Sequence, residues 1–411
     1  MSHREDLDPE TASVSEGYQP ERHLGSVKPP IYQTSTFATT TAAETKRYLE
    51  LLYGLVEPEE GEEVGFIYSR LDNPNLGVVE ARLASWEGAD DAIVCNSGMS
   101  AITTVLFTLL RPGDLVLYSS PLYGGTATVL GGIFAEWGIE AVPFAASVGE
   151  DELGALASDD RLGLIYLETP ANPTNDLFDI AAAARVAKAR DVPLAVDNTF
   201  LSPVWQRPLE HGADLVIHSA TKYLGGHSDL TAGAVCGDAA TIVRLRHTRY
   251  RIGSTADPMT AWLLGRSLET LGLRVRRQTE NATAVAAFLD GHPAVNWVNH
   301  LSLLVEGDPR REIYDRQCRG PGAMISFEVV GGEAGAFSFL DALKVVRLAV
   351  SLGGTESLAS HPWTTSHAIY SPEDKLDLGI TPGMIRLSVG VESSRDLMAD
   401  LDQALGAAGV P

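Results

Sequence analysis

Short apolar runs alternate with longer stretches of helical pattern across residues 73–273. Each run has the length of a strand and is nearly continuous in apolar residues, and small or polar residues follow it. Strands that are apolar on both faces are typical of a parallel sheet covered by helices on both sides. This region is therefore predicted to be a large α/β domain with a mostly parallel central sheet. The expected strands, with their turns, lie within 90–98, 113–120, 163–169, 192–198 and 213–219, and the expected helices within 99–110, 126–138 and 179–191.

The two flanking regions have different patterns. Residues 274–411 mix expected strands and helices and are predicted to form a smaller C-terminal α+β domain. Residues 1–72 are largely polar and are predicted to form an N-terminal arm that wraps a neighbouring subunit, with a short amphipathic helix at 46–56. The C-terminal region has expected strands at 322–332 and 384–392 and expected helices at 334–346 and 394–405.

Composition and charge narrow the class of protein. The chain has 411 residues, 45% of them hydrophobic and 21% charged, which is ordinary for a globular protein. No apolar stretch reaches the roughly 18 residues of a membrane span, and the polar N-terminus lacks the pattern of a secretion signal, so a cytoplasmic location is expected. The net charge of -23 argues against binding nucleic acid or an anionic membrane through bulk electrostatics. Cys95, Cys236 and Cys318 are too few and too scattered for a disulfide framework or a zinc site.

Polar, small or reactive residues follow every expected strand of the central region. Because ligands of parallel sheets bind beyond the carboxyl ends of the strands, these residues are expected to share one rim. The turn at Gly98 opens a helix whose N-terminus could cradle a phosphate, although such a turn alone is more often a simple N-cap. The rim is expected to contain Gly98 and Met99, Tyr123 in a glycine-rich turn, Asn172, Asp197, and Ser219, Thr221 and Lys222.

This set of groups fits pyridoxal 5'-phosphate. That cofactor needs a lysine for a Schiff base, an acidic partner for its pyridine nitrogen and a phosphate site, and it benefits from an aromatic ring to stack on. Taken singly the signals are weak, since Asp197 could cap a turn and Tyr123 could pack under a loop. The chain has no P-loop, and no dinucleotide-binding glycine motif follows the first strand.

Metal binding is not expected. His218 with His227, and His361 with His367, lack the spacing of a known zinc-binding helix. Ordinary hydrogen-bonded histidines are the favoured interpretation of both pairs.

Three segments carry a resemblance to a known family. YSRLDNPN at 68–75, AVDNTF at 195–200 and SATKYLGGHSD at 219–229 follow one another as in the trans-sulfuration (Cys/Met metabolism) enzymes. The similarity extends from about residue 24 to the C-terminus. It implies an aspartate-aminotransferase-like fold (fold type I), dependence on pyridoxal 5'-phosphate, and a tetramer built from dimers that share active sites.

The resemblance implies a role for each rim residue. Lys222 would hold the cofactor as a Schiff base and act as the catalytic base, and Asp197 would keep the pyridine nitrogen protonated. Tyr123 would stack on the ring and protonate the leaving group. The phosphate would be bound by Gly98, Met99, Ser219 and Thr221, joined by Tyr68 and Arg70 of a neighbouring subunit.

The resemblance also implies how the amino-acid substrate is bound. Arg386 would clamp the α-carboxylate, a task suited to a planar bidentate donor. Ser351 would orient both the substrate and Lys222. Asn172, near the 3-hydroxyl group of the cofactor, and Tyr68 would also contact the substrate.

Departures from the family pattern bear on the substrate. Ile67, Thr128 and Val350 are uncharged at positions where cystathionine-handling members are expected to carry charges. An apolar pocket end favours methionine γ-lyase-like α,γ-elimination to an α-keto acid, ammonia and a thiol. Gly125 argues against it, because methionine γ-lyases commonly place a cysteine there, and Leu352 argues against the β-lyase branch. γ-Replacement, as in cystathionine γ-synthase or O-acylhomoserine sulfhydrylase, cystathionine γ-lyase activity and a catalytically silent protein of this fold remain alternatives.

Overall fold

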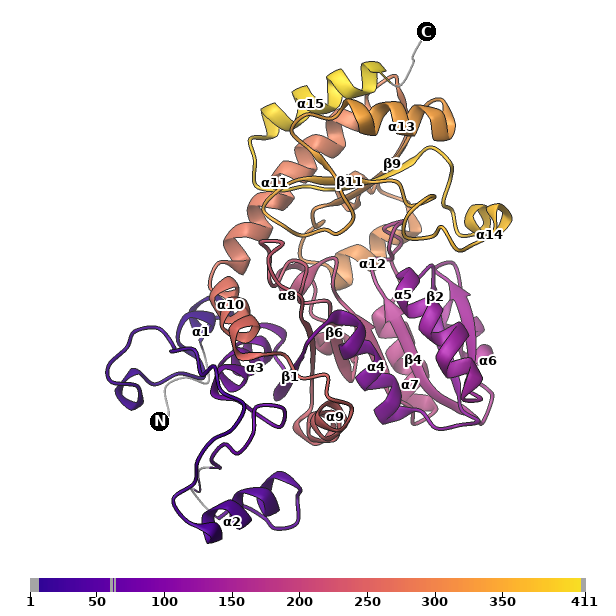
Figure 1. The fold of residues 1–411 in the computed structure, drawn as a ribbon. Coiled ribbons are helices and arrows are strands. Elements are labelled where there is room, and N and C mark those ends of the chain that lie inside the picture. The colour runs from indigo at the N-terminus through magenta and orange to yellow at the C-terminus, as the bar shows by residue number, and fades with distance from the viewer. Residues whose placement is uncertain (1–6, 60–61, 63, 408–411) are drawn as a thin grey trace.

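The computed structural model describes residues 7–59, 62 and 64–407, and these contain two β-sheets. The larger has seven strands in the order β1-β7-β6-β5-β4-β2-β3 (Figure 1). All its pairs are parallel except those of β7, which runs antiparallel to both neighbours. The predicted mostly parallel sheet is thus confirmed. Its strands are β1 (Asp91–Cys95), β2 (Leu115–Ser120), β3 (Glu140–Ala145), β4 (Leu162–Glu168), β5 (Leu194–Asp197), β6 (Leu215–His218) and β7 (Gly233–Gly237).

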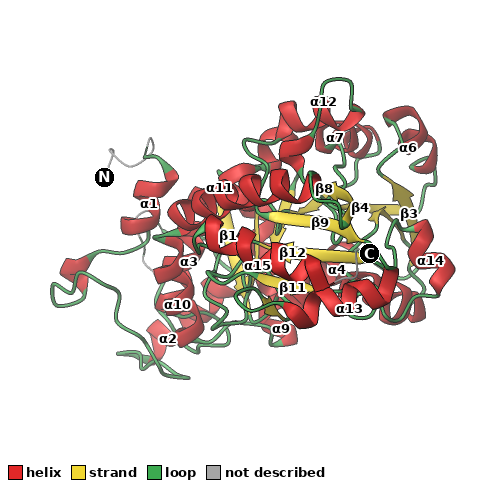
Figure 2. Cartoon of the chain, turned by 90° about the horizontal axis from the view of Figure 1, so that it is seen from above, coloured by secondary structure: helices red, strands yellow, loops and turns green. Residues whose placement is uncertain are grey.

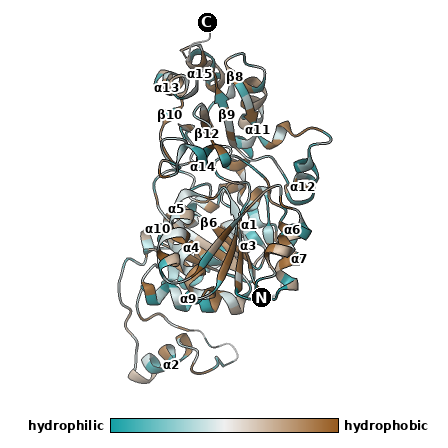
Figure 3. Cartoon of the chain, turned by 90° about the vertical axis from the view of Figure 1, so that its right-hand side faces the viewer, coloured by the Kyte–Doolittle hydropathy of each residue, from teal (hydrophilic) through white to brown (hydrophobic). Residues whose placement is uncertain are grey.

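Both faces of the larger sheet are buried, which explains the continuous apolar runs. Successive residues of a strand point to opposite faces, so Tyr166 and Ala195 belong to one hydrophobic cluster, whereas Ile165 and Val196 belong to another. Figure 3 shows the strands as a hydrophobic layer between helices. One face packs against α4 (Gly98–Leu109) and α9 (Ala239–Ile252), and the other against α3 (Pro74–Glu87), α6 (Glu150–Leu156) and α7 (Ile180–Ala189).

The second sheet has five strands in the order β10-β11-β12-β9-β8, and only the β10–β11 pair is parallel. Helices lie across it in Figure 2. The boundary predicted between 273 and 274 falls in the first turn of one of these helices, and the division into three regions remains a prediction. The strands are β8 (Val295–Asn299), β9 (Met324–Val329), β10 (Arg347–Leu348), β11 (Leu358–Ser360) and β12 (Met384–Ser388), and the helices are α11 (Leu271–Asp290), α13 (Gly332–Ala342) and α15 (Ser394–Ala407).

Two expected helices differ in extent from the pattern. The helix expected at 126–138 is α5 (Gly124–Val129) followed by a π-helical turn at Leu130–Phe134, where two glycines lower the helical propensity. The helix expected at 46–56 is α2 (Ala42–Leu52), which starts earlier because Thr41 forms a capping box with Glu44. The remaining helices are α1 (Pro9–Ser15), α8 (Ser202–Trp205), α10 (Pro258–Leu268), α12 (Pro309–Gln317) and α14 (Pro372–Asp377). None of the described helices is long and apolar enough to cross a membrane.

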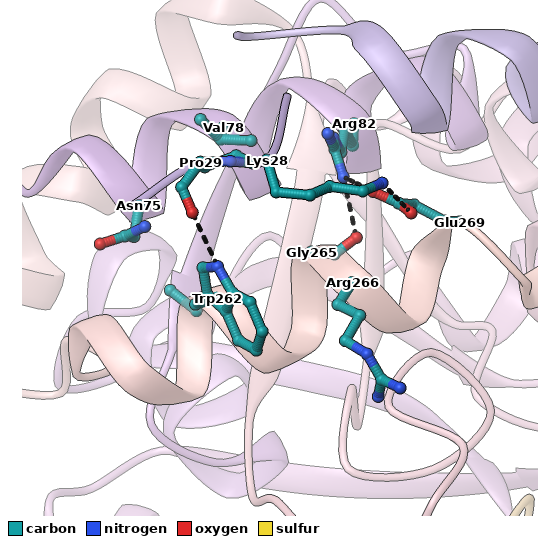
Figure 4. A pocket seen from close by; sticks show the side chains of 10 residues that line it. Lys28, Pro29, Asn75, Val78, Arg82, Trp262, Gly265, Arg266 and Glu269 are labelled. Atoms are coloured by element: carbon teal, nitrogen blue, oxygen red, sulfur yellow. Dashed lines mark hydrogen bonds and ion pairs between the residues drawn. The ribbon is translucent and has the colours of Figure 1, made fainter. Parts of the chain in front are cut away.

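The arm is fastened to the body at its base, and α2 projects beyond that point (Figure 1). Lys28 and Pro29 of the arm line a cavity of about 210 Å³ together with residues of α3 and α10. Figure 4 shows these arm residues beside the two helices. Trp262 donates its indole N–H to the carbonyl of Pro29 at 2.8 Å. Asn75, which is buried, makes two more bonds, accepting from the backbone N–H of Tyr32 and donating to the carbonyl of Pro30, both at 2.8 Å. The path of the chain from residue 29 to 32 is therefore fixed by side chains of the body.

Replacing Asn75 by Ala should loosen the arm. Both backbone groups of the arm would lose their buried partner, at a cost of about 1–3 kcal/mol. We expect faster proteolytic cleavage within residues 17–35 and a lower Tm. Asn296→Ala is the matched control, since the Asn296 amide bonds only to the exposed Glu328 carboxylate at 3.1 Å. Equal cleavage rates in the two variants would contradict this account of the arm.

Candidate active site

A cavity of about 640 Å³ lies at the carboxyl ends of the parallel strands, between the two sheets. The larger sheet contributes residues that follow β4, β5 and β6 and the first turn of α4. The C-terminal region contributes residues 350–352, 365–366 and 386. Ten of the predicted catalytic, cofactor-binding and substrate-binding residues line this cavity: Gly98, Met99, Tyr123, Asn172, Asp197, Ser219, Thr221, Lys222, Ser351 and Arg386.

Lys222 lies in the turn after β6, and its ammonium donates to the Ser351 hydroxyl at 2.7 Å. Burial, and then the positive charge of Arg386, lower the pKa of Lys222 to about 8. A lysine with such a pKa is a base and nucleophile near neutral pH. Ser351 has a φ of 103°, which a non-glycine residue rarely adopts, so its backbone is held in a strained conformation beside the lysine.

Asp197 ends β5 with its carboxylate nearly buried. Oδ1 accepts from the backbone N–H and the hydroxyl of Thr199, at 3.0 and 2.6 Å. Oδ2 accepts from the Tyr166 hydroxyl at 3.4 Å. Burial raises the pKa of Asp197, while the Thr199 bonds lower it. A buried carboxylate with an available lone pair is suited to a cationic partner in the cavity.

Arg386, on β12, brings the second sheet into the site. Nη1 donates to Asn172 Oδ1 at 2.9 Å, and Nη2 donates to the Ser351 carbonyl at 3.1 Å. Burial lowers the pKa of this guanidinium to about 10, so it remains a cation at neutral pH. An anionic group of a small substrate is the natural partner for a buried cation that has only neutral bonding partners here.

Glu168 is a site residue that the sequence did not single out. It ends β4 and is buried in the cavity wall. Oε2 accepts from the backbone N–H of Tyr123 at 3.0 Å and Oε1 from that of Asn172 at 2.8 Å. Burial and the nearby Asp197 raise the pKa of Glu168 to about 8. Its position, the last strand residue before a turn, matches that of Asp197 and is the signal that could have found it.

The residues at the N-terminus of α4 fit a phosphate group. Ser97 caps this helix, and the first amide N–H groups of a helix have no partner within it. A side chain at Gly98 would close this space, because a Cβ there would lie 2.8 Å from Ser219 Oγ. Together with the buried carboxylate of Asp197 and the amine of Lys222, this cradle matches the three anchors that pyridoxal 5'-phosphate requires.

Tyr123 stands at the cavity mouth, and Gly125 gives its ring room. The Tyr123 side chain is 43% exposed, at the N-terminus of α5. A Cβ at Gly125 would lie 2.5 Å from Tyr123 Cε1 and 2.9 Å from Met99 Sδ. The ring therefore occupies the space that any larger residue at 125 would use.

Tyr68 and Arg70 do not line the cavity of their own chain. Arg70 donates to the Tyr250 carbonyl at 2.6 Å and lies 5.7 Å from the centre of the Tyr68 ring. Of the three uncharged positions expected at the pocket end, only Val350 lines this cavity. Thr128 bonds to the Gly124 carbonyl at 2.7 Å.

The histidines considered as metal ligands make ordinary hydrogen bonds. His218 lies 2.5 Å from Glu87 Oε1, and His361 Nε2 lies 2.8 Å from the Pro382 carbonyl. His227 Nδ1 lies 2.8 Å from the Gly225 carbonyl, and His367 Nδ1 lies 3.0 Å from the Ser366 hydroxyl. No group of three or more metal-ligating side chains was found in the described part of the chain.

The fold and this set of anchors define a pyridoxal-phosphate-dependent enzyme. The family model described as "Cys/Met metabolism PLP-dependent enzyme" matches residues 10–406, and the chain belongs to that family. The related proteins are lyases and synthases of trans-sulfuration. The expected family and its cofactor, pyridoxal phosphate, are therefore confirmed.

Characterised relatives resemble the chain over nearly its whole length. An L-methionine gamma-lyase of Pseudomonas putida is 42% identical over 401 residues, 97% of each chain. A cystathionine gamma-synthase of Mycobacterium tuberculosis is 39% identical over 399 residues, again 97% of each. The structure of cystathionine gamma synthase from Xanthomonas oryzae pv. oryzae in complex with cystathionine superposes with a TM-score of 0.89 at 35% identity and 98% coverage of both chains. Cystathionine gamma-lyase from Lactobacillus plantarum gives 0.88 at 34% identity, covering 98% of this chain and 99% of the other.

The Lys222 environment predicts an unusual titration of the apo protein. Only the neutral amine reacts with acetic anhydride, so the acetylation rate of Lys222 should rise with pH and level off above about 8. In Arg386→Gln the midpoint should move to higher pH, because a cation that disfavours protonation is removed. Peptide mass spectrometry gives the rate, with the exposed Lys188 as internal reference. A midpoint near the ordinary lysine value of 10.5 would contradict this description of the site.

Replacing Gly125 by Ala should slow turnover by displacing the Tyr123 ring. Displacing a catalytic group by about 1 Å can cost roughly 100-fold in rate, so we expect kcat to fall about 10- to 100-fold. Steady-state kinetics measure the effect. Gly131→Ala, whose added Cβ would contact nothing within 4 Å, is the control and should keep its rate. An unchanged kcat in Gly125→Ala would show that the ring position does not matter.

Proposed function

We propose that the protein is a carbon–sulfur lyase that eliminates the γ-substituent of methionine or a related amino acid with an uncharged side-chain end. The products would be an α-keto acid, ammonia and a thiol. The observation that carries this proposal is the charge inventory of the cavity. Its ionisable acidic and basic lining residues are Glu168, Asp197, Lys222 and Arg386. The last three would act at the cofactor or at the α-carbon end of the substrate, and Glu168 accepts from the backbone N–H groups of Tyr123 and Asn172.

The cavity wall also offers uncharged apolar contacts. Val350 lines the wall with 65% of its surface exposed, and Leu352 and Ile102 also line the cavity. A charged distal group, such as the amino-acid end of cystathionine, would find no opposite charge on these walls. A methylthio group would bury apolar surface at about 25 cal/mol per Å². Small uncharged tails are therefore favoured over charged ones.

Arg386 would hold the substrate α-carboxylate, with Asn172 and Ser351 fixing the orientation of the guanidinium. Lys222 would then take the proton from Cα, which its lowered pKa permits near neutral pH. Bound pyridoxal phosphate supplies the electron sink that makes this proton removable. Asp197 would bind the ring nitrogen, and Gly98, Met99, Ser219 and Thr221 would bind the phosphate.

Tyr123 would protonate the leaving sulfur after the bond to Cγ breaks. Its hydroxyl-bearing ring stands at the cavity mouth, and its backbone is held by Glu168. Release of the α-keto acid and ammonia consumes one water molecule. Addition of a thiol at Cγ instead gives γ-replacement, as in cystathionine γ-synthase, and the synthase and lyase names among the relatives keep this second candidate open.

The placement of the arm supports a shared site. Tyr68 and Arg70 lie outside the cavity of their own chain, and the four described residues that would bind the phosphate, Gly98, Met99, Ser219 and Thr221, include no cation. We propose that Tyr68 and Arg70 complete the phosphate site, and Tyr68 the substrate site, of a neighbouring subunit. A homotetramer built from such dimers, located in the cytoplasm, is part of this proposal.

A substrate panel tests the proposed function. Turnover of methionine should exceed that of cystathionine and of O-acylhomoserine with a thiol, measured as α-keto acid release and thiol consumption. A kcat/KM for cystathionine above that for methionine would reject elimination from an uncharged tail.

Val350→Glu should shift this preference. A carboxylate at the cavity wall would attract the distal ammonium of cystathionine, and we expect the cystathionine-to-methionine ratio of kcat/KM to rise by roughly tenfold. Leu348→Glu adds the same charge two residues away on the exposed β10 and should leave the ratio unchanged. An equal change in both variants would mean that Val350 does not set the specificity.

A further inference from the structure

A buried glutamate–histidine pair lies directly behind the site. Glu87 is the last residue of α3 and His218 the last residue of β6, four residues before Lys222. Their side chains are almost completely buried, and His218 Nε2 lies 2.5 Å from Glu87 Oε1. Two ionisable groups in the core are costly to bury unless they act as a pair.

Further contacts tie this pair to the residue beside Asp197. Asn198 donates its side-chain N–H to Glu87 Oε1 at 3.3 Å. Because an amide N–H can only donate, Glu87 is the acceptor there, and the same oxygen accepts from His218. Glu87 Oε2 is buried and has no hydrogen-bond partner among the described residues. The carboxylate thus spans the ends of β5 and β6, which also meet through the bond from the Asn198 N–H to the Ile217 carbonyl at 2.9 Å.

Titratable groups near Asp197 lie on the adjacent strands β4 and β6, and one near Glu87 lies on β7, the next strand beyond β6. On β4, Glu168 is a second buried carboxylate and Tyr166 donates its hydroxyl at 3.4 Å. On β6, His218 is the basic group, and its proximity lowers the pKa of Asp197 against the effect of burial. On β7, the Cys236 thiol faces Glu87, which helps raise the pKa of that thiol. His218 is thus a basic group whose charge lowers the pKa of Asp197, and the cations Lys222 and Arg386 line the same cavity as that carboxylate.

We propose that Glu87 and His218 are positioning residues that keep the Asp197 carboxylate ionised and aimed at the ring nitrogen of the cofactor. Glu87 accepts the Nε2 proton of His218 and so fixes the orientation of the imidazole at the end of β6. It also holds Asn198 in place next to that carboxylate. The inference rests on the proposed contact between Asp197 and the ring nitrogen.

The test distinguishes the contribution of the ring nitrogen to cofactor affinity from the contribution of the rest of the cofactor. The apo protein is titrated with pyridoxal phosphate and with its 1-deaza analogue, in which a C–H group replaces the ring nitrogen. In Glu87→Gln the Kd for pyridoxal phosphate should rise by roughly tenfold, equivalent to one pKa unit. The Kd for the deaza analogue should stay unchanged, because it lacks the atom through which the pair acts.

Matched variants exclude a merely structural role. Glu80, another buried glutamate of α3, pairs with Arg249 at 2.5 Å away from the cavity. Glu80→Gln should lower the Tm but leave the ratio of the two Kd values as in the wild type. His218→Gln is the second variant, should Glu87→Gln not fold, and should reduce the same ratio. Equal weakening of both ligands, or no weakening, in the folded variants would overturn the proposal.

Asp197→Asn distinguishes failure of this inference from failure of the proposed site. If that variant loses the preference for pyridoxal phosphate while Glu87→Gln keeps it, Asp197 contacts the ring nitrogen without help from the pair. If Asp197→Asn also keeps the full preference, the proposed contact itself is wrong. Loss of the preference in both variants, with Glu80→Gln unaffected, is the expected result.

Discussion

The burial of charged groups at the junction of the two sheets is the constraint on which the site depends. Asp197, Glu168, Lys222 and Arg386 all lie away from bulk water, where an isolated charge is unstable. Each makes hydrogen bonds with neutral groups. Burial is the main cause of the pKa shift of each, and like charges add to it for Glu168 and Lys222. Burial makes these charges costly because it lowers the local dielectric constant. The same low dielectric constant strengthens their interaction with pyridoxal phosphate, whose phosphate is anionic and whose protonated ring is cationic.

Backbone segments with little freedom keep these groups in place. β4, β5 and β6 end at one edge of the sheet, so Glu168, Asp197 and the turn before Lys222 lie side by side through register alone. Glu168 then uses both carboxylate oxygens to hold the turns that carry Tyr123 and Asn172. The lysine is met from the other sheet by Ser351, whose backbone conformation is unusual for its residue type. A precise site thus arises from strand ends and short turns, without long side-chain networks.

Sequence patterns predicted five of the seven strands of the central sheet and most of the residues that line the cavity. Continuous apolar runs identify buried parallel strands, and a reactive residue after such a run lies at the rim by geometry. Patterns missed two strands for different reasons: β3 is partly exposed and carries Pro143 at the sheet edge, and β7 is a short buried strand that begins and ends with glycine. Glu168 escaped notice because its task is to bind backbone N–H groups, which leave no trace in residue type. The pair Glu87–His218 joins residues 131 positions apart, a separation that no local pattern reports.

The two proposed substrate-binding groups, Lys222 and Arg386, come from different sheets, and this has a mechanical consequence. Lys222 belongs to the larger sheet and Arg386 to the smaller one, while α11 packs against β8 and β9 of the smaller sheet and begins beside the larger one. A small rotation of one sheet relative to the other would therefore change the spacing between the Lys222 amine and the Arg386 guanidinium, the proposed proton acceptor and carboxylate-binding group. Under the proposed roles, one movement would both bring Arg386 to the substrate carboxylate and align the Cα–H bond with Lys222. The length of the bound amino acid would limit how far the two sheets can approach each other.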